Sequence, residues 1–141
     1  MVKEDEPLNK NNIKEIKTRN ALISYDEKNG IIRAIYAPGT EEVLEDAENN
    51  LSAVGKISKG RKFPILIIGD HKSMSRNARV FYTTEAPKFV TAIAVLIHSP
   101  IQKVIASFLL SLNRKINKNE FQLKFFNSEK EALLWLRKFT K

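Results

Sequence analysis

The chain has 141 residues, a net charge of +8 and no cysteine, which fits one domain whose core needs no disulfide or thiolate metal site. It has only two histidines, so metal binding and histidine catalysis have little material. No segment approaches the roughly 18 apolar residues of a membrane span, and the first residues show no signal-peptide pattern. We therefore expect a cytoplasmic protein without a membrane span or cofactor.

The first third of the chain predicts an arm, a hairpin and a helix. Residues 1–18 are polar and predict a flexible N-terminal arm or short helix, followed by a single domain over residues 19–141. Two β-rich segments, 22–25 and 31–36, flank Asn29-Gly30. This pair predicts an antiparallel hairpin, because the favoured two-residue turn needs positive φ at both central residues.

Thr40 is the expected N-cap of the first helix, since Glu41 and Glu42 then lie in the first turn, where the helix dipole favours negative charge. Apolar residues follow at a spacing close to 3.6 and predict the stripe that packs on the sheet: Val43, Leu44, Ala47, Leu51 and Val54.

The run Ile65 to Ile68 is too short for a helix and does not alternate, so it predicts a strand buried on both faces of a sheet. A polar turn leads from it to a second helix, which Ser73 or Ser75 can cap and which Pro87 closes. Residues 90–97 are a second apolar strand.

Ser99-Pro100 marks the start of a third helix, over residues 100–112, because proline suits the first helical position. A strand is predicted over residues 121–126. Ser128 to Glu131 reads as a capping box, and the stripe Ala132, Trp135, Leu136 and Phe139 predicts a last helix.

The elements follow the order ββαβαβαβα. Right-handed crossovers place four helices on both faces of a mixed sheet of about five strands, opened by the hairpin. This α/β arrangement resembles the STAS domain, the fold of anti-sigma-factor antagonists of the SpoIIAA type. More narrowly, residues 21–139 resemble a group of small uncharacterised bacterial STAS-like proteins, and the segments 78–82, 92–96 with Ser99, and 125–136 carry this resemblance.

The resemblance implies a candidate phosphoacceptor and partner surface formed by Asp70, Ser73, Ser75, Arg76 and Arg79. Antagonists of this family carry a phosphorylatable serine in an Asp-Ser-Ser/Thr-Gly-like turn after the buried strand, and the matching residues here lack the glycine and the contiguous Asp-Ser. Independently of the family, a phosphate at a helix N-terminus meets free backbone N–H groups.

Simpler readings of the same residues stay open. Ser75 can be an N-cap without further role, Arg79 can form a surface ion pair, for example with Glu85, and His71 reads as a lone exposed histidine.

We therefore expect a non-catalytic regulatory or protein-interaction module with an unknown protein partner, since no nucleophile-base pair, metal cluster or phosphate loop can be assembled. The alternative is a small-ligand or lipid carrier with an apolar pocket between the 100–112 helix and the sheet, lined by Phe108, Leu109 and Leu112.

Charge along the chain is segregated. Acids dominate residues 26–48 and bases dominate residues 56–79, so we expect two electrostatically different faces that suit an acidic partner or a second copy. The edge strands of the hairpin also favour a homodimer. Nucleic acid is not the expected partner, because we find no aromatic-interleaved basic run.

Overall fold

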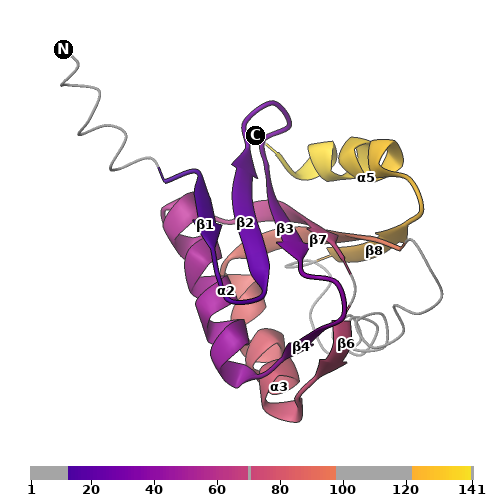
Figure 1. The fold of residues 1–141 in the computed structure, drawn as a ribbon. Helices are drawn as coiled ribbons and strands as arrows, with labels where there is room; N and C mark the ends of the chain where they lie inside the picture. Colours follow the sequence, from indigo (N-terminus) through magenta and orange to yellow (C-terminus); the bar gives the residue numbers. More distant parts are fainter. Residues whose placement is uncertain (1–12, 70, 98–121, 141) are drawn as a thin grey trace.

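The computed structural model describes residues 13–69, 71–97 and 122–140, shown in Figure 1. Their elements follow in this order: β1 (Glu15–Lys17), β2 (Ala21–Asp26), β3 (Ile31–Tyr36), β4 (Thr40–Glu42), α2 (Leu44–Ser58), β5 (Phe63–Ile68), β6 (His71–Met74), α3 (Arg76–Glu85), β7 (Val90–Leu96), β8 (Gln122–Phe126) and α5 (Glu129–Leu136). Two short 3-10 turns, η1 (Ala86–Lys88) and η2 (Arg137–Phe139), follow α3 and α5.

Six of the strands form one mixed sheet in the order β1-β2-β3-β5-β7-β8. The first three strands pair antiparallel, and β3, β5, β7 and β8 pair parallel. The predicted mixed sheet is confirmed, but its strand number was wrong. Residues 15–17, which we expected in the arm, pair with β2 and add the sixth strand.

The helix number also differs from the prediction, because three α-helices lie in the described ranges. The predicted helix over residues 100–112 falls outside them, and so do the expected pocket residues Phe108, Leu109 and Leu112.

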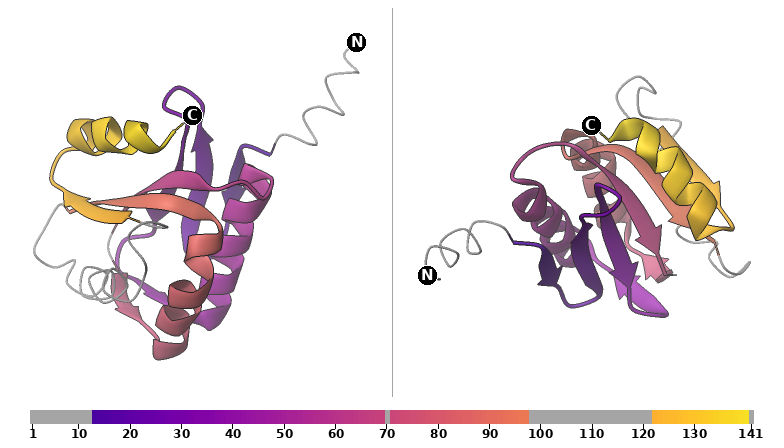
Figure 2. Two further views of the ribbon diagram at one scale, coloured as in Figure 1. Left: turned by 180° about the vertical axis from the view of Figure 1, so that it is seen from behind. Right: turned by 90° about the horizontal axis from the view of Figure 1, so that it is seen from above.

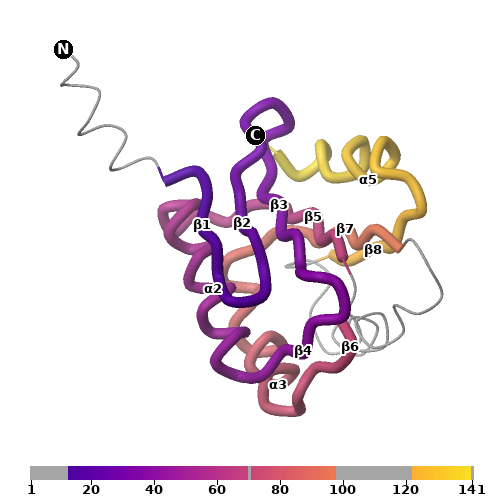
Figure 3. The backbone as a smooth tube through the Cα atoms, viewed as in Figure 1, coloured from indigo at the N-terminus to yellow at the C-terminus, as the bar shows by residue number. Residues whose placement is uncertain are grey.

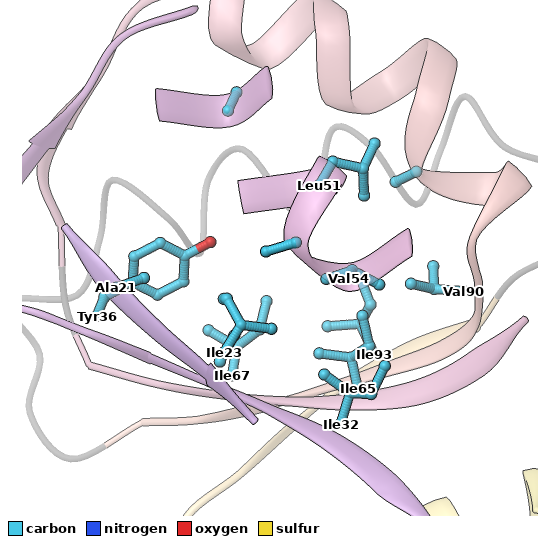
Figure 4. Packing of buried hydrophobic residues seen from close by; sticks show 14 of the residues in the cluster. Ala21, Ile23, Ile32, Tyr36, Leu51, Val54, Ile65, Ile67, Val90 and Ile93 are labelled. Atoms are coloured by element: carbon cyan, nitrogen blue, oxygen red, sulfur yellow. The ribbon is translucent and has the colours of Figure 1, made fainter. Parts of the chain in front are cut away.

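Helices cover both faces of the sheet: α2 and α3 lie on one side and α5 on the other (Figure 2). In β5, Ile65 and Ile67 pack into the core beneath α2 and α3, whereas Leu66 packs toward α5. The prediction of a strand buried on both faces is therefore confirmed. Figure 4 shows the larger core, in which Ile65 and Ile67 lie with residues of α2 and β7.

The hairpin is confirmed, but its turn is not the predicted one. The loop between β2 and β3 has four residues, 27–30, and the Gly30 N–H donates to the Asp26 carbonyl at 2.8 Å. Gly30 has φ of 69°, whereas Asn29 stays at negative φ. The Asp26 carboxylate accepts from the Asn29 backbone and side chain at 3.1 and 2.8 Å, and these bonds close the wider loop.

The start of α2 was predicted wrongly. Thr40 does not cap the helix, because residues 40–42 form β4, and Val43 is the N-cap residue. The Asp46 carboxylate accepts from the Val43 N–H at 3.0 Å and so supplies the cap. Glu42 consequently points inward from a strand instead of outward from a helical turn, with 1 % of its surface exposed.

Beyond the main sheet, β4 and β6 form a two-stranded parallel pair of their own. In the chain, β4 follows β3 and β6 follows β5. The two segments that pair in parallel as β3 and β5 therefore separate and then pair again as β4 and β6 (Figure 3). The break contains Gly39 and Gly69, which both have positive φ. This second pair turns residues after the carboxyl ends of β3 and β5 toward α2 and α3.

The last helix follows the predicted signal. Ser128 is the N-cap of α5 and accepts from the Glu131 N–H at 3.3 Å. Ala132 and Leu136 are fully buried against the sheet, while Trp135 and Phe139 pack beside them. The helix ends at Leu136, earlier than the stripe suggested.

Candidate functional site

The predicted site residues lie where β6 enters α3. In β6, His71 and Met74 are buried whereas Lys72 and Ser73 are exposed. Ser75 then caps α3, because its Oγ accepts from the Ala78 N–H at 3.1 Å. Asp70 lies outside the described residues. We call the exposed side chains of this junction the α3 surface: Lys72, Ser73, Arg76, Arg79 and Val80.

Arg79 does not form the expected ion pair with Glu85. Its Nη1 donates to the Met74 carbonyl at 2.5 Å, so the guanidinium folds back toward the start of its own helix. Glu85 pairs with Lys88 at 3.1 Å instead. The structure therefore places a cation one turn from Ser75.

The first turn of α3 contains no acidic residue, whereas α2 and α5 carry acids in theirs. Arg76 and Arg79 occupy the N-terminal half of α3 instead. Positive side chains are unfavourable at the positive end of a helix dipole, by about 0.3–1 kcal/mol each. An anion at Ser75 would offset this cost.

Acidic and basic segments meet at this end of the molecule. Lys72 on β6 lies 3.7 Å from Glu41 on β4, because the two strands pair in parallel. The segregation of charge that we predicted from the sequence is thus reduced in space, since β4 carries acids directly beside the basic β6.

Beneath the α3 surface lies a set of buried polar side chains that we call the Glu42 cluster: Asn20, Tyr36, Glu42, Asn50, His71 and Tyr82. The Glu42 carboxyl group is its centre. His71 Nε2 lies 2.5 Å from Oε1, and the Tyr82 hydroxyl donates to Oε2. The side-chain amides of Asn20 and Asn50 donate at 3.4 and 3.3 Å.

The two tyrosines of the cluster are protonated and neutral. Burial, together with the nearby charge of Glu42, raises the pKa of the Tyr36 hydroxyl far above its usual range. Burial also raises the pKa of the Tyr82 hydroxyl, and so do Tyr36 and Glu42 beside it. The Tyr36 ring lies 4.4 Å from the imidazole of His71, measured between centroids.

An ion pair extends the cluster toward solvent. Arg19 donates to both carboxylate oxygens of Asp46 at 2.7 Å and to the Glu41 carbonyl at 2.7 Å. The hydrogen bond from Arg19 lowers the pKa of Asp46 despite its burial. Thr18 donates to Asn50 at 2.6 Å and links the same region to the turn before β2.

His71 was wrongly expected to be exposed: 2 % of its surface is accessible. Its Nδ1 is buried and has no hydrogen-bond partner in the described part of the chain. Sequence reasoning missed the Glu42 cluster because its members come from β3, β4, α2, β6, α3 and the turn before β2. Thr40 and Glu42 point inward and Glu41 points outward, which is the alternation of a β-strand. Because the inward residues are polar, the hydrophobic pattern did not predict this strand.

The core between the sheet and the helices α2 and α3 has little room for a ligand. A cavity of about 60 Å³ lies between the sheet and the two helices α2 and α3, lined mainly by apolar residues. This is well below the roughly 150 Å³ that accommodates benzene in an engineered cavity. No three His, Cys, Asp or Glu side chains among the described residues are placed to hold a metal ion. None of the described helices has the length and apolar character needed to cross a membrane.

We expect Ser75→Ala to lower the free energy of unfolding by about 1 kcal/mol, because the Ala78 N–H loses its side-chain acceptor. Urea denaturation measures this change. Ser73→Ala is the matched control, since Ser73 is exposed on β6 and should change stability by less than about 0.5 kcal/mol. Equal effects of the two substitutions would contradict the capping role.

Among solved structures, the chain is similar to an uncharacterised protein of the DUF3478 family, with a SpoIIAA-like fold, from Shewanella loihica PV-4. The identity is 17 %, the TM-score is 0.52, and the match covers 86 % of this chain and 90 % of that chain. This likeness concerns the fold alone and confirms the predicted resemblance to SpoIIAA-like domains.

The model of a family described as "Domain of unknown function (DUF7793)" matches residues 25–140, and the chain belongs to that family. A search of curated proteins finds no match.

Proposed function

We propose that this protein is a non-catalytic interaction module of the STAS type, which binds a protein partner through the α3 surface and is switched by phosphorylation of Ser75. The observation that carries the proposal is the position of Ser75 at the start of α3, with Arg79 folded back toward it and no acid in the first turn. The SpoIIAA-like fold of the solved relative supports the same class.

The α3 surface suits an acidic partner in its unmodified state. Arg76 and Arg79 are exposed, and Val80 is 56 % exposed, which adds an apolar contact between polar neighbours. Interfaces of this kind combine a few apolar contacts with charges that direct encounter. We therefore expect the partner to present carboxylates around a small apolar patch.

Phosphorylation of Ser75 reverses the charge at the centre of this surface. A protein kinase would transfer the γ-phosphoryl group of ATP to Ser75 Oγ, forming the ester bond and releasing ADP and a proton. The phosphate adds about −1.5 to −2 charge. It would take the hydrogen bond of the Ala78 N–H and pair with Arg79, which removes the arginine from the partner.

A crosslinking experiment tests both parts of the proposal. A photoreactive amino acid replaces Val80 on α3 in the native cells, and the same residue replaces Leu134 on α5 as control. The two positions are 56 % and 52 % exposed, so they differ in location and not in accessibility. We expect a defined crosslinked protein from position 80 and none from position 134.

The switch is tested in the same crosslinked system with phosphoserine installed at position 75. We expect the crosslink from position 80 to fall at least tenfold, and to persist in Ser75→Ala. Phosphopeptide mapping of the protein from its native cells must also find phosphate on Ser75. Identical crosslinks from positions 80 and 134 would contradict the interaction surface, whereas a crosslink unchanged by phosphoserine would contradict the switch alone.

A further inference from the structure

Two hollows are lined by residues near the hairpin tip and the C-terminus. These parts of the chain lie at the opposite end of the sheet from α3 (Figure 1). The larger hollow has a volume of about 640 Å³ and the smaller about 330 Å³. Tyr25, Arg61 and Phe63 line both hollows, and we call the two neighbouring hollows together the groove. A ligand pocket usually has about 300–1,000 Å³, and each hollow falls in this range.

Aromatic rings from three separate elements line the larger hollow. Tyr25 lies near the end of β2 and Phe63 begins β5, with ring centroids 5.8 Å apart in an edge-to-face arrangement. Phe139 of η2 lines the larger hollow. All three rings are partly exposed rather than buried, so flat ligand groups can reach them.

Cations outnumber acids in the lining of the groove. Lys14 and Lys59 line the smaller hollow together with Glu27, which pairs with Lys14 at 3.1 Å, and Lys62 lines the larger hollow. Within the described residues, neither Arg61 nor Lys62 has a carboxylate partner. The Arg61 guanidinium lies 5.2 Å from the centre of the Phe63 ring. Arg61 thus brings a cation beside an aromatic ring of the groove.

Contrary to the expectation from the sequence, in which no run combines rings and cations, we propose that this groove binds a short stretch of single-stranded nucleic acid, with bases stacked on the Tyr25, Phe63 and Phe139 rings and phosphates held by Arg61 and Lys62. Non-specific single-strand sites combine a positive groove with stacking rings in this way. An acidic peptide could pair with the cations but has no bases to stack on the rings. A flat anionic membrane would meet the rim of the groove but not its floor.

Fluorescence anisotropy with a labelled oligothymidylate of about 12 nucleotides, at about 50 mM salt, tests the proposal. We expect binding that weakens as salt rises. The double variant Arg61→Gln, Lys62→Gln should weaken it at least tenfold. It should also reduce the slope of log affinity against log salt by about 1.4, which is about 0.7 for each phosphate that is no longer neutralised.

A matched variant separates the groove from the general positive charge of the protein. Lys72→Gln, Arg76→Gln removes two charges from the α3 surface and should weaken oligonucleotide binding less than about threefold. An equal loss of affinity in both variants would show binding by net charge and overturn the groove. Failure of the wild-type chain to bind at low salt would overturn it as well, and neither result affects the partner crosslink from α3.

The fluorescence of the chain's own tryptophan gives an independent measurement of oligonucleotide binding. The chain has one tryptophan, Trp135, whose ring lies 4.9 Å from that of Phe139 at the groove. We expect oligothymidylate to change the tryptophan fluorescence with the same midpoint as the anisotropy. Tyr25→Leu should weaken binding roughly tenfold, because a base can no longer stack on the ring. Equal affinity for thymidine monophosphate and the oligonucleotide would contradict the binding of a nucleic-acid strand and would indicate a site for a single nucleotide.

Discussion

Glu42→Ala should lower the free energy of unfolding by about 3–5 kcal/mol, the range for breaking a buried charged network by removing one partner. Glu42 is 1 % exposed and receives hydrogen bonds from Asn20 before β2, from α2 and from α3. The substitution removes the acceptor that these donors share, and each buried donor that finds no other partner adds its own desolvation cost.

Urea denaturation monitored by circular dichroism measures the effect, and the neighbouring residue supplies the control. Glu41 lies on the same strand with an exposed side chain and a 3.7 Å contact to Lys72. Exposed ion pairs of this kind contribute little, so Glu41→Ala should change stability by less than about 1 kcal/mol. Similar changes in Glu41→Ala and Glu42→Ala would show that the Glu42 cluster does not stabilise the fold.

Gly69→Ala should cost at least about 3 kcal/mol, because strain and overlap act together at this position. Gly69 has φ of 113°, and an added Cβ would lie 2.7 Å from the Tyr36 carbonyl oxygen. That oxygen belongs to the backbone at the end of β3 and cannot move without displacing the Tyr36 side chain, which packs against His71. The damage should therefore reach the Glu42 cluster.

Gly39→Ala is the matched control for Gly69→Ala. Gly39 has φ of 66°, and no heavy atom of the described residues lies within 4 Å of an added Cβ. It should cost only the left-handed penalty of a non-glycine residue, about 1–2 kcal/mol. Thermal unfolding of both variants separates the two costs, and an equal decrease in stability would mean that the close approach to Tyr36 is relieved easily.

Much of the fold could be predicted from the sequence because its long elements have clear patterns. The apolar run of β5, the cap at Ser75 and the cap at Ser128 all lie where the pattern placed them. The three-residue strands β1 and β4 could not be predicted in this way. Each makes only a few pairings, and neighbouring strands, rather than their own composition, decide whether they form.

The candidate site was predicted only in part, for a physical reason. Exposed residues such as Ser73 and Arg79 follow from the strand and helix that carry them. The inward position of Glu42 depends on the register of β4, because a shift of one residue moves every side chain of a strand to the other face. A glutamate after threonine fits a helix start equally well, so the local sequence favoured the wrong alternative.

The homodimer prediction needs a different basis. Free edges of the hairpin were one of its two supports, but β1 pairs with β2 and β3 pairs with β5. In the described sheet the outer strands are β1 and β8. Self-association stays a prediction, and it would have to use one of these two strands or another surface.

The strand order has a consequence for synthesis on the ribosome. In the sheet β1-β2-β3-β5-β7-β8, each strand lies beside the one that precedes it in the main sheet along the chain. A chain that emerges from its N-terminus can therefore add every new strand to an edge that already exists. No strand of the described sheet has to insert between two paired neighbours. Assembly can thus keep pace with translation, which shortens the time during which apolar strands such as β5 and β7 are exposed to other chains.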